Sequence, residues 1–172
     1  GQEGAATLKK VCDALMALEG CRVNVRCGLH VHLDVNDLTV QEITSIYARY
    51  ADFESQIDLL MPRSRRDSAN TYCASIKGSA SRVKRTQSKR QLGRTCGRYY
   101  KVNLQSLNKY GTVEFRQHAG TQSFEKIINW VVTLMVFVET SVNLASNATP
   151  TVKKNRVYHN VRQAVENLGG YV

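Results

Sequence analysis

The stretch CGLHVHLD, residues 27–34, constrains the fold more than any other part of this chain. In a β-strand, successive side chains point to opposite faces. His30, His32 and Asp34 would therefore share one face, and the aliphatic residues between them would share the other. The pattern predicts a strand with one face on a core and three metal-capable side chains on the other face. Taken alone, it also fits a half-buried strand whose polar face is simply solvated.

A second stretch, TVEFRQH at 112–118, repeats this alternation. On a strand, Glu114, Arg116 and His118 would share one face. Carboxylates and imidazoles hold divalent metals, and an arginine can clamp a phosphate through two N–H groups. Core packing would favour apolar residues at these positions, so the two strands together favour a functional site.

Three chemistries fit such a pair of strands. The first is a metal–phosphate site, in which arginine offsets the charge of phosphoryl transfer. The second is a cupin-like oxygenase or isomerase site, and the third is a metal hydrolase that activates water. The arginine on the metal face favours phosphate. Cupins also need many short strands, whereas much of this chain shows helical patterns.

The positive charge is concentrated in one segment. Residues 63–101 contain 12 Lys or Arg and a single acid, Asp67, in a chain whose net charge is +10. Such a segment attracts phosphate on a nucleotide, a nucleic acid or an acidic polymer. Residues 63–100 lack sustained periodicity, so we predict a long basic loop or insertion with a short ordered piece near Tyr72, Cys73 and Ile76. A solvated loop without a ligand is the alternative.

Apolar periodicity outlines the remaining elements. Helices are predicted at 5–19, 40–60, 123–145 and 155–168. We expect the first helix to pack on a sheet, Thr39 to cap the second, and the third, apolar nearly all round, to be buried. Strands are predicted at 22–35, 100–106 and 112–118, with the last two forming a hairpin. The sequence thus predicts one α+β domain over 1–172, in which an antiparallel sheet carrying the HxHxD and ExRxH strands packs against several helices.

The composition also bears on the compartment. Five cysteines without a CxxC pair argue against a disulfide scaffold or a zinc ribbon and suit a reducing environment. The first residues, GQEGAATLKK, lack the apolar region of a signal peptide, and the apolar run at 130–138 is too short to span a bilayer. We therefore expect a cytoplasmic protein without a membrane partner.

The chain combines the stretches CGLHVHLD, MPRSRR, NTYC, KVNLQSL and TVEFRQHAGT. In this combination it resembles the amidoligase family, whose members are carboxylate–amine ligases related to glutamine synthetase and the glutamate–cysteine ligases. The resemblance covers about residues 5–145. It implies a glutamine-synthetase-like catalytic core that forms an amide or isopeptide bond. In this reaction a carboxylate attacks the γ-phosphate of ATP, with Mg²⁺ or Mn²⁺, and an amine displaces phosphate from the acyl phosphate. Family members often occur in bacteriophages and beside genes for peptide or cell-wall modification, which implies a phage-encoded protein and substrates of that kind.

The resemblance also implies roles for individual residues. Glu114 and Arg116 would be catalytic, with Glu114 binding metal and Arg116 steadying the transferring phosphate. The implied metal ligands are His30, Glu114 and Asp34. The implied nucleotide-binding residues are His32, Arg65, Arg66, Lys77 and His118.

The chain departs from the family at its start. Family members open with a Gly-x-Glu-x-Glu strand whose carboxylates complete the metal sites, whereas Glu3 lies in QEGAA, which is not strand-like. Without those oxygen ligands we expect the catalytic core to be incomplete. The chain alone would be a weak or inactive ligase unless a preceding segment, a second copy or a partner supplies the strand. The alternatives are a structural or nucleic-acid-binding module that contacts nucleic acid or a virion through residues 63–101, and a metal-dependent hydrolase or oxygenase.

Overall fold

The computed structural model of this protein describes residues 1–145. Its helices are α1 (Gln2–Ala17), α2 (Val40–Asp52), α3 (Glu54–Leu59), α4 (Ala80–Lys84), α5 (Lys89–Thr95), α6 (Ser106–Tyr110) and α7 (Phe124–Ala145), with 3-10 turns η1 (Arg63–Arg65) and η2 (Lys77–Ser79). Its strands are β1 (Val31–Asp34), β2 (Val102–Asn103) and β3 (Thr112–Phe115). The helix predicted at 155–168 lies outside the described residues.

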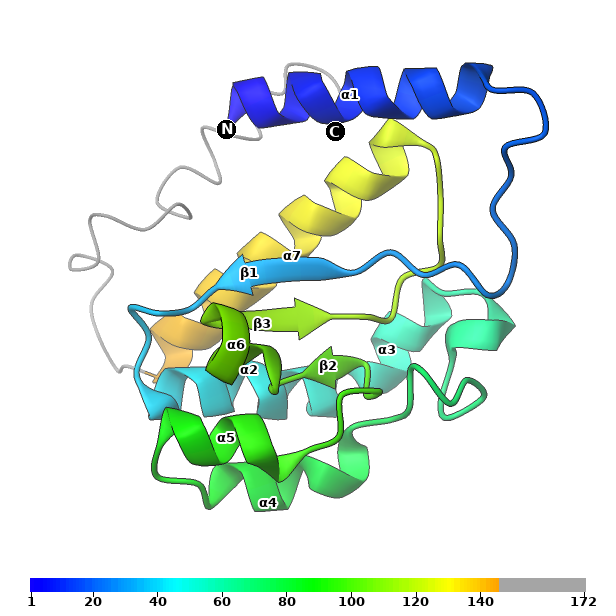
Figure 1. The fold of residues 1–172 in the computed structure, drawn as a ribbon. Coiled ribbons are helices and arrows are strands. Elements are labelled where there is room, and N and C mark those ends of the chain that lie inside the picture. Colours follow the sequence, from blue (N-terminus) through cyan, green and yellow to red (C-terminus); the bar gives the residue numbers. More distant parts are fainter. Residues whose placement is uncertain (146–172) are drawn as a thin grey trace.

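The three strands form one antiparallel sheet in the order β1-β3-β2 (Figure 1). His32 on β1 and Asn103 on β2 both lie opposite Glu114 on the central strand. The α+β prediction is therefore confirmed, and the register places Glu114 in the middle of the sheet.

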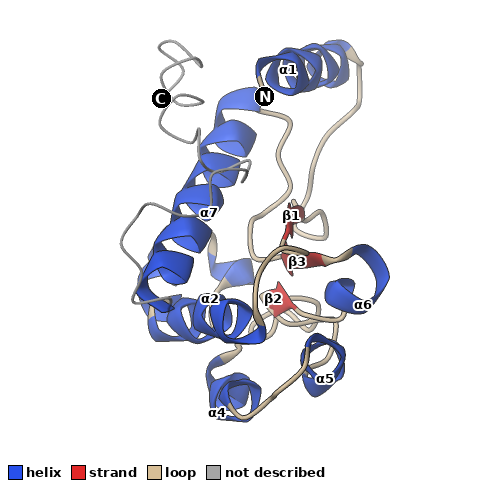
Figure 2. Ribbon diagram, turned by 90° about the vertical axis from the view of Figure 1, so that its left-hand side faces the viewer, coloured by secondary structure: helices blue, strands red, loops and turns tan. Residues whose placement is uncertain are grey.

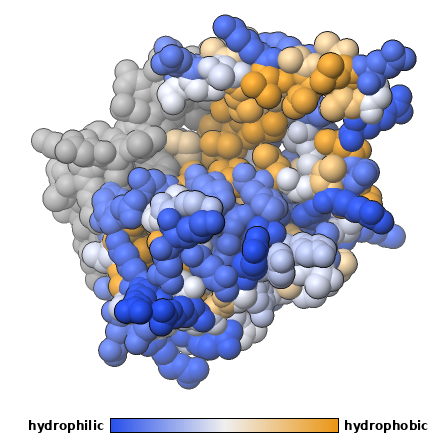
Figure 3. All heavy atoms as spheres, in the orientation of Figure 1, coloured by the Kyte–Doolittle hydropathy of each residue, from blue (hydrophilic) through white to orange (hydrophobic). Residues whose placement is uncertain are grey.

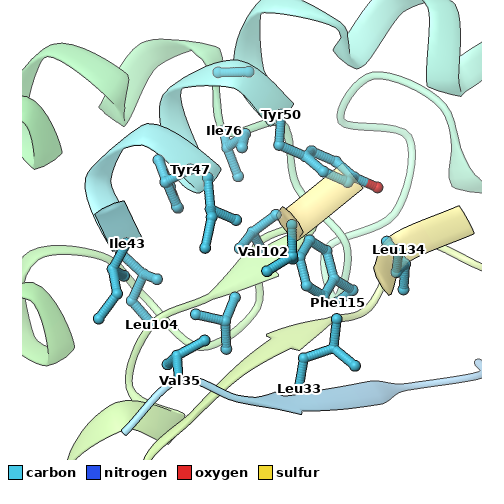
Figure 4. Close-up of a cluster of buried hydrophobic side chains, with 14 of the residues drawn as sticks. Leu33, Val35, Ile43, Tyr47, Tyr50, Ile76, Val102, Leu104, Phe115 and Leu134 are labelled. Carbon is cyan, nitrogen blue, oxygen red and sulfur yellow. The ribbon is translucent and has the colours of Figure 1, made fainter. Parts of the chain in front are cut away.

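One face of this sheet carries the hydrophobic core. α2 packs against α7, and both lie on the same side of the sheet (Figure 2). Leu33 and Phe115 from the sheet meet Tyr47 and Tyr50 of α2 and Leu134 of α7 in this cluster (Figure 4). Burial of each such side chain contributes about 1.5–3 kcal/mol, so this face fixes which way the strands point.

The alternation predicted for the HxHxD strand is observed. Val31 and Leu33 are buried, whereas His32 and Asp34 are exposed. The predicted length, 22–35, is wrong, because the strand begins only at Val31. Before it, the chain makes a single isolated bridge between Gly28 and Ala119.

The predicted helix at 40–60 is two helices. It begins as expected, because the Thr39 side chain accepts a hydrogen bond from the Glu42 N–H and the Glu42 carboxylate accepts one from the Thr39 N–H. It breaks at Phe53, which is exposed together with Leu60. Beyond the break, α3 buries its acidic side chains Glu54 and Asp58, which pair with a buried lysine described below.

α1 does not pack on the sheet as predicted. Cys12 of α1 is buried against Phe124 and Ile128, so the helix lies on the start of α7 (Figure 1). α7 itself matches the predicted range but is buried along one face, with Val136 and Leu144 exposed. By length and composition alone, α7 is long and apolar enough to cross a membrane, and its inner face packs on α2.

The basic segment is ordered rather than a long loop. It contains η1, η2, α4 and α5, and it buries Cys73, Ile76, Val83, Leu92 and Cys96. Helices of only a few residues each contribute one or two core side chains, and this explains why the sequence shows no sustained period. The predicted hairpin is observed in part. β2 pairs with β3, but the short helix α6 joins them, and Gly111, whose φ is +67°, follows the end of α6.

Candidate functional site

A buried carboxylate, Glu114, lies at the centre of the polar side chains on the sheet. Its Oε1 accepts hydrogen bonds from Arg116 Nη1 at 2.7 Å and His30 Nδ1 at 2.9 Å, and its Oε2 accepts one from Asn103 Nδ2 at 2.6 Å. His32 Nε2 lies 3.8 Å from the same Oε1. We call these five residues the Glu114 cluster.

The strand register assembles the cluster. His32 and Asn103 flank Glu114 across the sheet, while His30 and Arg116 lie just beyond the paired ends of β1 and β3. The Arg116 N–H donates to the Lys101 carbonyl at 2.8 Å, so the extended backbone continues past β3. His32 is oriented by a 2.9 Å contact between its Nδ1 and Thr112 Oγ1.

Two glycines permit a close approach at this end of the sheet. A Cβ on Gly28 would lie 3.0 Å from the guanidinium nitrogens of Arg65 and 3.2 Å from His30 Nε2. A Cβ on Gly120 would lie 2.5 Å from the Cβ of Cys27. The absence of a side chain at Gly28 lets Arg65 lie beside His30, and its absence at Gly120 lets the chain approach Cys27 closely.

The neighbours of Glu114 keep it ionised. Burial alone would raise the pKa of its carboxyl group, but the hydrogen bonds from His30 and Asn103 and the positive charge of Arg116 outweigh burial and lower the pKa to about 2. The site therefore holds a fixed carboxylate that orients Arg116.

Two open cavities meet at this cluster. The larger, about 690 Å³, is lined by residues that include Arg26, Arg65 and Tyr72, and by no acidic side chain. The smaller, about 420 Å³, is lined by residues that include Arg98 and Glu114. His30 and Arg116 line both cavities. The arrangement suits an elongated anion that lies in the larger cavity. One end of this anion would reach His30 and Arg116, which form the wall that the two cavities share.

A buried ionic network supports this wall from behind. Lys101 is fully buried, and its Nζ donates to Glu54 at 3.0 Å and to Asp58 at 2.7 Å. Gln117, which follows Arg116, donates to Asp58 and accepts from the Tyr50 hydroxyl at 2.7 Å. The sequence does not predict this network, because nothing in the local pattern pairs Lys101 with acids more than 40 positions away.

Asn103 is a further member of the cluster that was not among the predicted site residues, although the sequence carries a signal for it. It alternates with Val102 and Leu104 on a predicted strand. An amide at that position faces the polar side of the sheet, where a neighbouring strand carries Glu114.

The other predicted site residues divide into two groups. Arg65 is buried, lines the larger cavity and donates from Nη2 to the Cys27 carbonyl at 2.6 Å. Arg66 instead donates to the Met61 carbonyl, and Lys77 donates to Ser55 Oγ; neither lines the two cavities.

His118 and Asp34 also lie apart from the cluster. The His118 ring packs 5.4 Å from the Trp130 ring, and its Nδ1 contacts the Ala119 carbonyl. Burial lowers the pKa of His118, although the contact with Ala119 raises it. Asp34 accepts from the Asn36 N–H at the far end of β1. The structure therefore brings together His30, His32, Glu114 and Arg116, but not His118 or Asp34.

The side chains of the Glu114 cluster can be compared with the ligands that a magnesium ion requires. Among residues 1–145, no group of three or more His, Cys, Asp or Glu side chains is arranged to hold a metal. The one carboxylate of the cluster already accepts from Arg116, His30 and Asn103. Since Mg²⁺ prefers several oxygen ligands, the described residues do not by themselves fit it. Metal hydrolase and oxygenase sites need a comparable ligand group, so no observation favours those alternatives.

The fold and site thus define an α+β domain with a cationic cleft of two joined cavities around a buried Glu–Arg pair. The sequence model of the family described as "putative amidoligase enzyme" matches residues 1–138, and the chain belongs to that family. No curated protein and no solved structure matches the chain. Family membership confirms the resemblance seen in the sequence and supports a ligase function in general terms.

Proposed function

We propose that this domain is an ATP-dependent carboxylate–amine ligase that acts through an acyl phosphate. The observation that carries the proposal is the shared wall of His30 and Arg116 between the two cavities. Such a ligase must bring a nucleotide and a carboxylate together at the γ-phosphate. Two cavities that meet at one guanidinium provide that arrangement.

The larger cavity suits the phosphates of ATP. Arg26, Arg65 and Arg116 line it, and no acidic side chain does. Arginine stays charged and can hold phosphate oxygens through two N–H groups. Glu114 holds the Arg116 guanidinium in the shared wall through a hydrogen bond to one of its nitrogens. In the proposed reaction, negative charge develops beside this wall as the phosphoryl group transfers.

The smaller cavity would then take the carboxylate substrate and the amine. Arg98 and Lys109 line it and can attract a carboxylate, while His32 and Glu114 lie at its inner end. Peptide or cell-wall-derived substrates are one class that this open cavity would admit. The proposed cofactors are ATP and Mg²⁺ or Mn²⁺, and the assay contains both.

The open edge of β1 supports the idea that a further strand completes the site. Leu29 and Val35 direct their N–H groups to the carbonyls of His118 and Gly111 on the β3 side. By alternation, the backbone groups of His30, His32 and Asp34 point to the other side, which is the edge of the sheet. A strand paired there, from another segment or a second copy of the chain, would bring its side chains beside His30 and His32. Carboxylates on that strand would supply the missing oxygen ligands.

The test is ATP turnover and nucleotide binding by the whole protein. With MgATP, a carboxylate donor and an amine, we expect ADP release that Arg116→Ala and Glu114→Ala abolish. Arg22→Ala, an exposed arginine away from both cavities, serves as the matched control and should retain full turnover. Circular dichroism at pH 7 establishes that each variant is folded.

Two results would refute the proposal. One is turnover that survives both cluster substitutions. The other is failure of the unmodified protein to bind ATP at millimolar concentration by calorimetry, because a cavity with three arginines should bind a triphosphate even when turnover needs a further strand.

A further inference from the structure

α4 and α5 present a surface of unpaired positive charge. Exposed cations lie on these two helices and at the C-cap of α4. They are Arg82, Lys84, Arg85, Arg90 and Arg94, and we call them the α4–α5 basic face. In the orientation of Figure 1 these helices lie at the bottom, and strongly hydrophilic side chains gather over that region in Figure 3. The ion pairs found in residues 1–145 involve other cations, so none joins this face to a carboxylate.

These charges do not hold the fold together. α4 and α5 attach to the core through Val83 and Leu92, which are fully buried on the opposite side. Arg90 and Arg94 are four positions apart on one helix, a spacing at which like charges destabilise it. A concentration of charge that weakens the free protein favours a polyanionic ligand.

Two exposed aromatic rings belong to the same basic segment of the chain as α4 and α5. Tyr72 and Tyr99 are 61% and 42% exposed, and their rings meet edge to face at 5.1 Å. The Arg98 guanidinium lies 5.1 Å from the centroid of the Tyr99 ring. Arg98 and Tyr99 follow the end of α5 within a few residues. Exposed aromatic rings combined with a cationic surface are the arrangement that proteins use to bind single-stranded nucleic acid, with phosphates on the cations and bases stacked on the rings.

We propose that the α4–α5 basic face and the Tyr72–Tyr99 pair bind single-stranded nucleic acid. The strand's phosphates lie along the arginines of α4 and α5, and its bases stack on Tyr99. A duplex keeps its bases stacked internally and offers nothing to the tyrosines. The residues of the α4–α5 basic face line neither proposed ligase cavity. The aromatic pair borders the cavities, because Tyr72 lines the larger one and the Arg116 guanidinium lies 5.8 Å from the centroid of the Tyr99 ring. The inference does not depend on turnover of ATP.

The first test is fluorescence anisotropy with a labelled oligothymidylate of about 20 nucleotides, long enough to exceed one binding site. The test variant is Arg85→Ala/Arg90→Ala/Arg94→Ala. The matched control is Lys10→Ala/Arg22→Ala/Lys126→Ala, which removes the same charge from exposed positions elsewhere.

We expect the test variant to bind at least about tenfold more weakly near 0.1 M salt, because each phosphate contact contributes about 0.7 to the slope of log affinity against log salt for single strands. Three lost contacts should therefore reduce the slope by about 2. The control variant should keep its slope. An equal loss in both variants would mean that net charge alone is responsible, and it would overturn the assignment to this face.

The second test addresses the tyrosine. Tyr99→Ala should weaken oligothymidylate at least about fivefold and leave the affinity for heparin unchanged, since stacking of one base contributes a factor of that size or more. If Tyr99→Ala has no effect, or if heparin or duplex DNA binds as tightly as the single strand, the face is a general polyanion surface and the proposal fails.

Discussion

Replacement of Glu114 by glutamine should destabilise the domain in a pH-dependent way. The pKa of this carboxyl group is about 2 in the folded protein, against 4.5 for the unperturbed group. Each pKa unit corresponds to about 1.36 kcal/mol, so ionised Glu114 stabilises the fold by about 3 kcal/mol at neutral pH. That is a large part of the 5–15 kcal/mol that typically stabilises a domain.

The sign follows from the depressed pKa. The stabilisation is fully present above pH 4.5, where the carboxylate is ionised in both states, and is lost as the pH falls through the folded-state value near 2. Because glutamine mimics the protonated form, the difference in the free energy of unfolding between wild type and Glu114→Gln should be about 3 kcal/mol at pH 7. It should fall to about 1.4 kcal/mol at pH 3.

Urea unfolding measured at several pH values between 3 and 7 tests this. Trp130 is the only tryptophan of the chain and is buried, so its fluorescence reports the transition. Glu19→Gln is the control, since this glutamate is exposed and joins no described ion pair. A difference that stays constant from pH 7 to pH 3 would show that shape rather than charge causes the loss, and it would refute the reasoning.

Two further substitutions test the support of the site by urea unfolding at pH 7. Lys101→Met leaves Glu54 and Asp58 buried without their cation and should lower the free energy of unfolding by about 3–5 kcal/mol. Adding Glu54→Gln and Asp58→Asn should recover much of this loss. A Lys101→Met variant as stable as wild type would contradict the role of the network. Gly120→Ala places a Cβ 2.5 Å from that of Cys27 and should cost about 1–3 kcal/mol. Gly4→Ala, in α1 with no atom within 4 Å, should instead be neutral or stabilising, and equal effects of the two glycine variants would dismiss the steric argument.

The sequence located the central residues because strand alternation is a local property. The two-residue period put His32 and Glu114 on the polar faces of their strands, and pairing of β1 with β3 then made them neighbours. The same reasoning misplaced His118. Val31 lies opposite Phe115, but Gly28 is bridged to Ala119, so the pairing shifts by one residue between them and the His118 ring turns to Trp130. Asp34 keeps the predicted face but lies at the other end of β1 from His30.

Long-range contacts decided what periodicity could not. The basic segment seemed unstructured because its core residues are spread over several short helices, and only packing shows that Val83 and Leu92 are buried. The burial of Glu54 and Asp58 on α3 likewise involves Lys101, a partner far along the chain.

The amino-acid sequence by itself determined the α+β class, the family and the polar strands that meet at Glu114, since these follow from local alternation and from motifs. Only the tertiary structure decided that Arg65 lies over Gly28, that two cavities share Arg116, and that α4 and α5 direct their charge outward. Those features depend on which distant segments pack together. The free energy of that packing comes from contacts throughout the core, so no single stretch of the sequence predicts it.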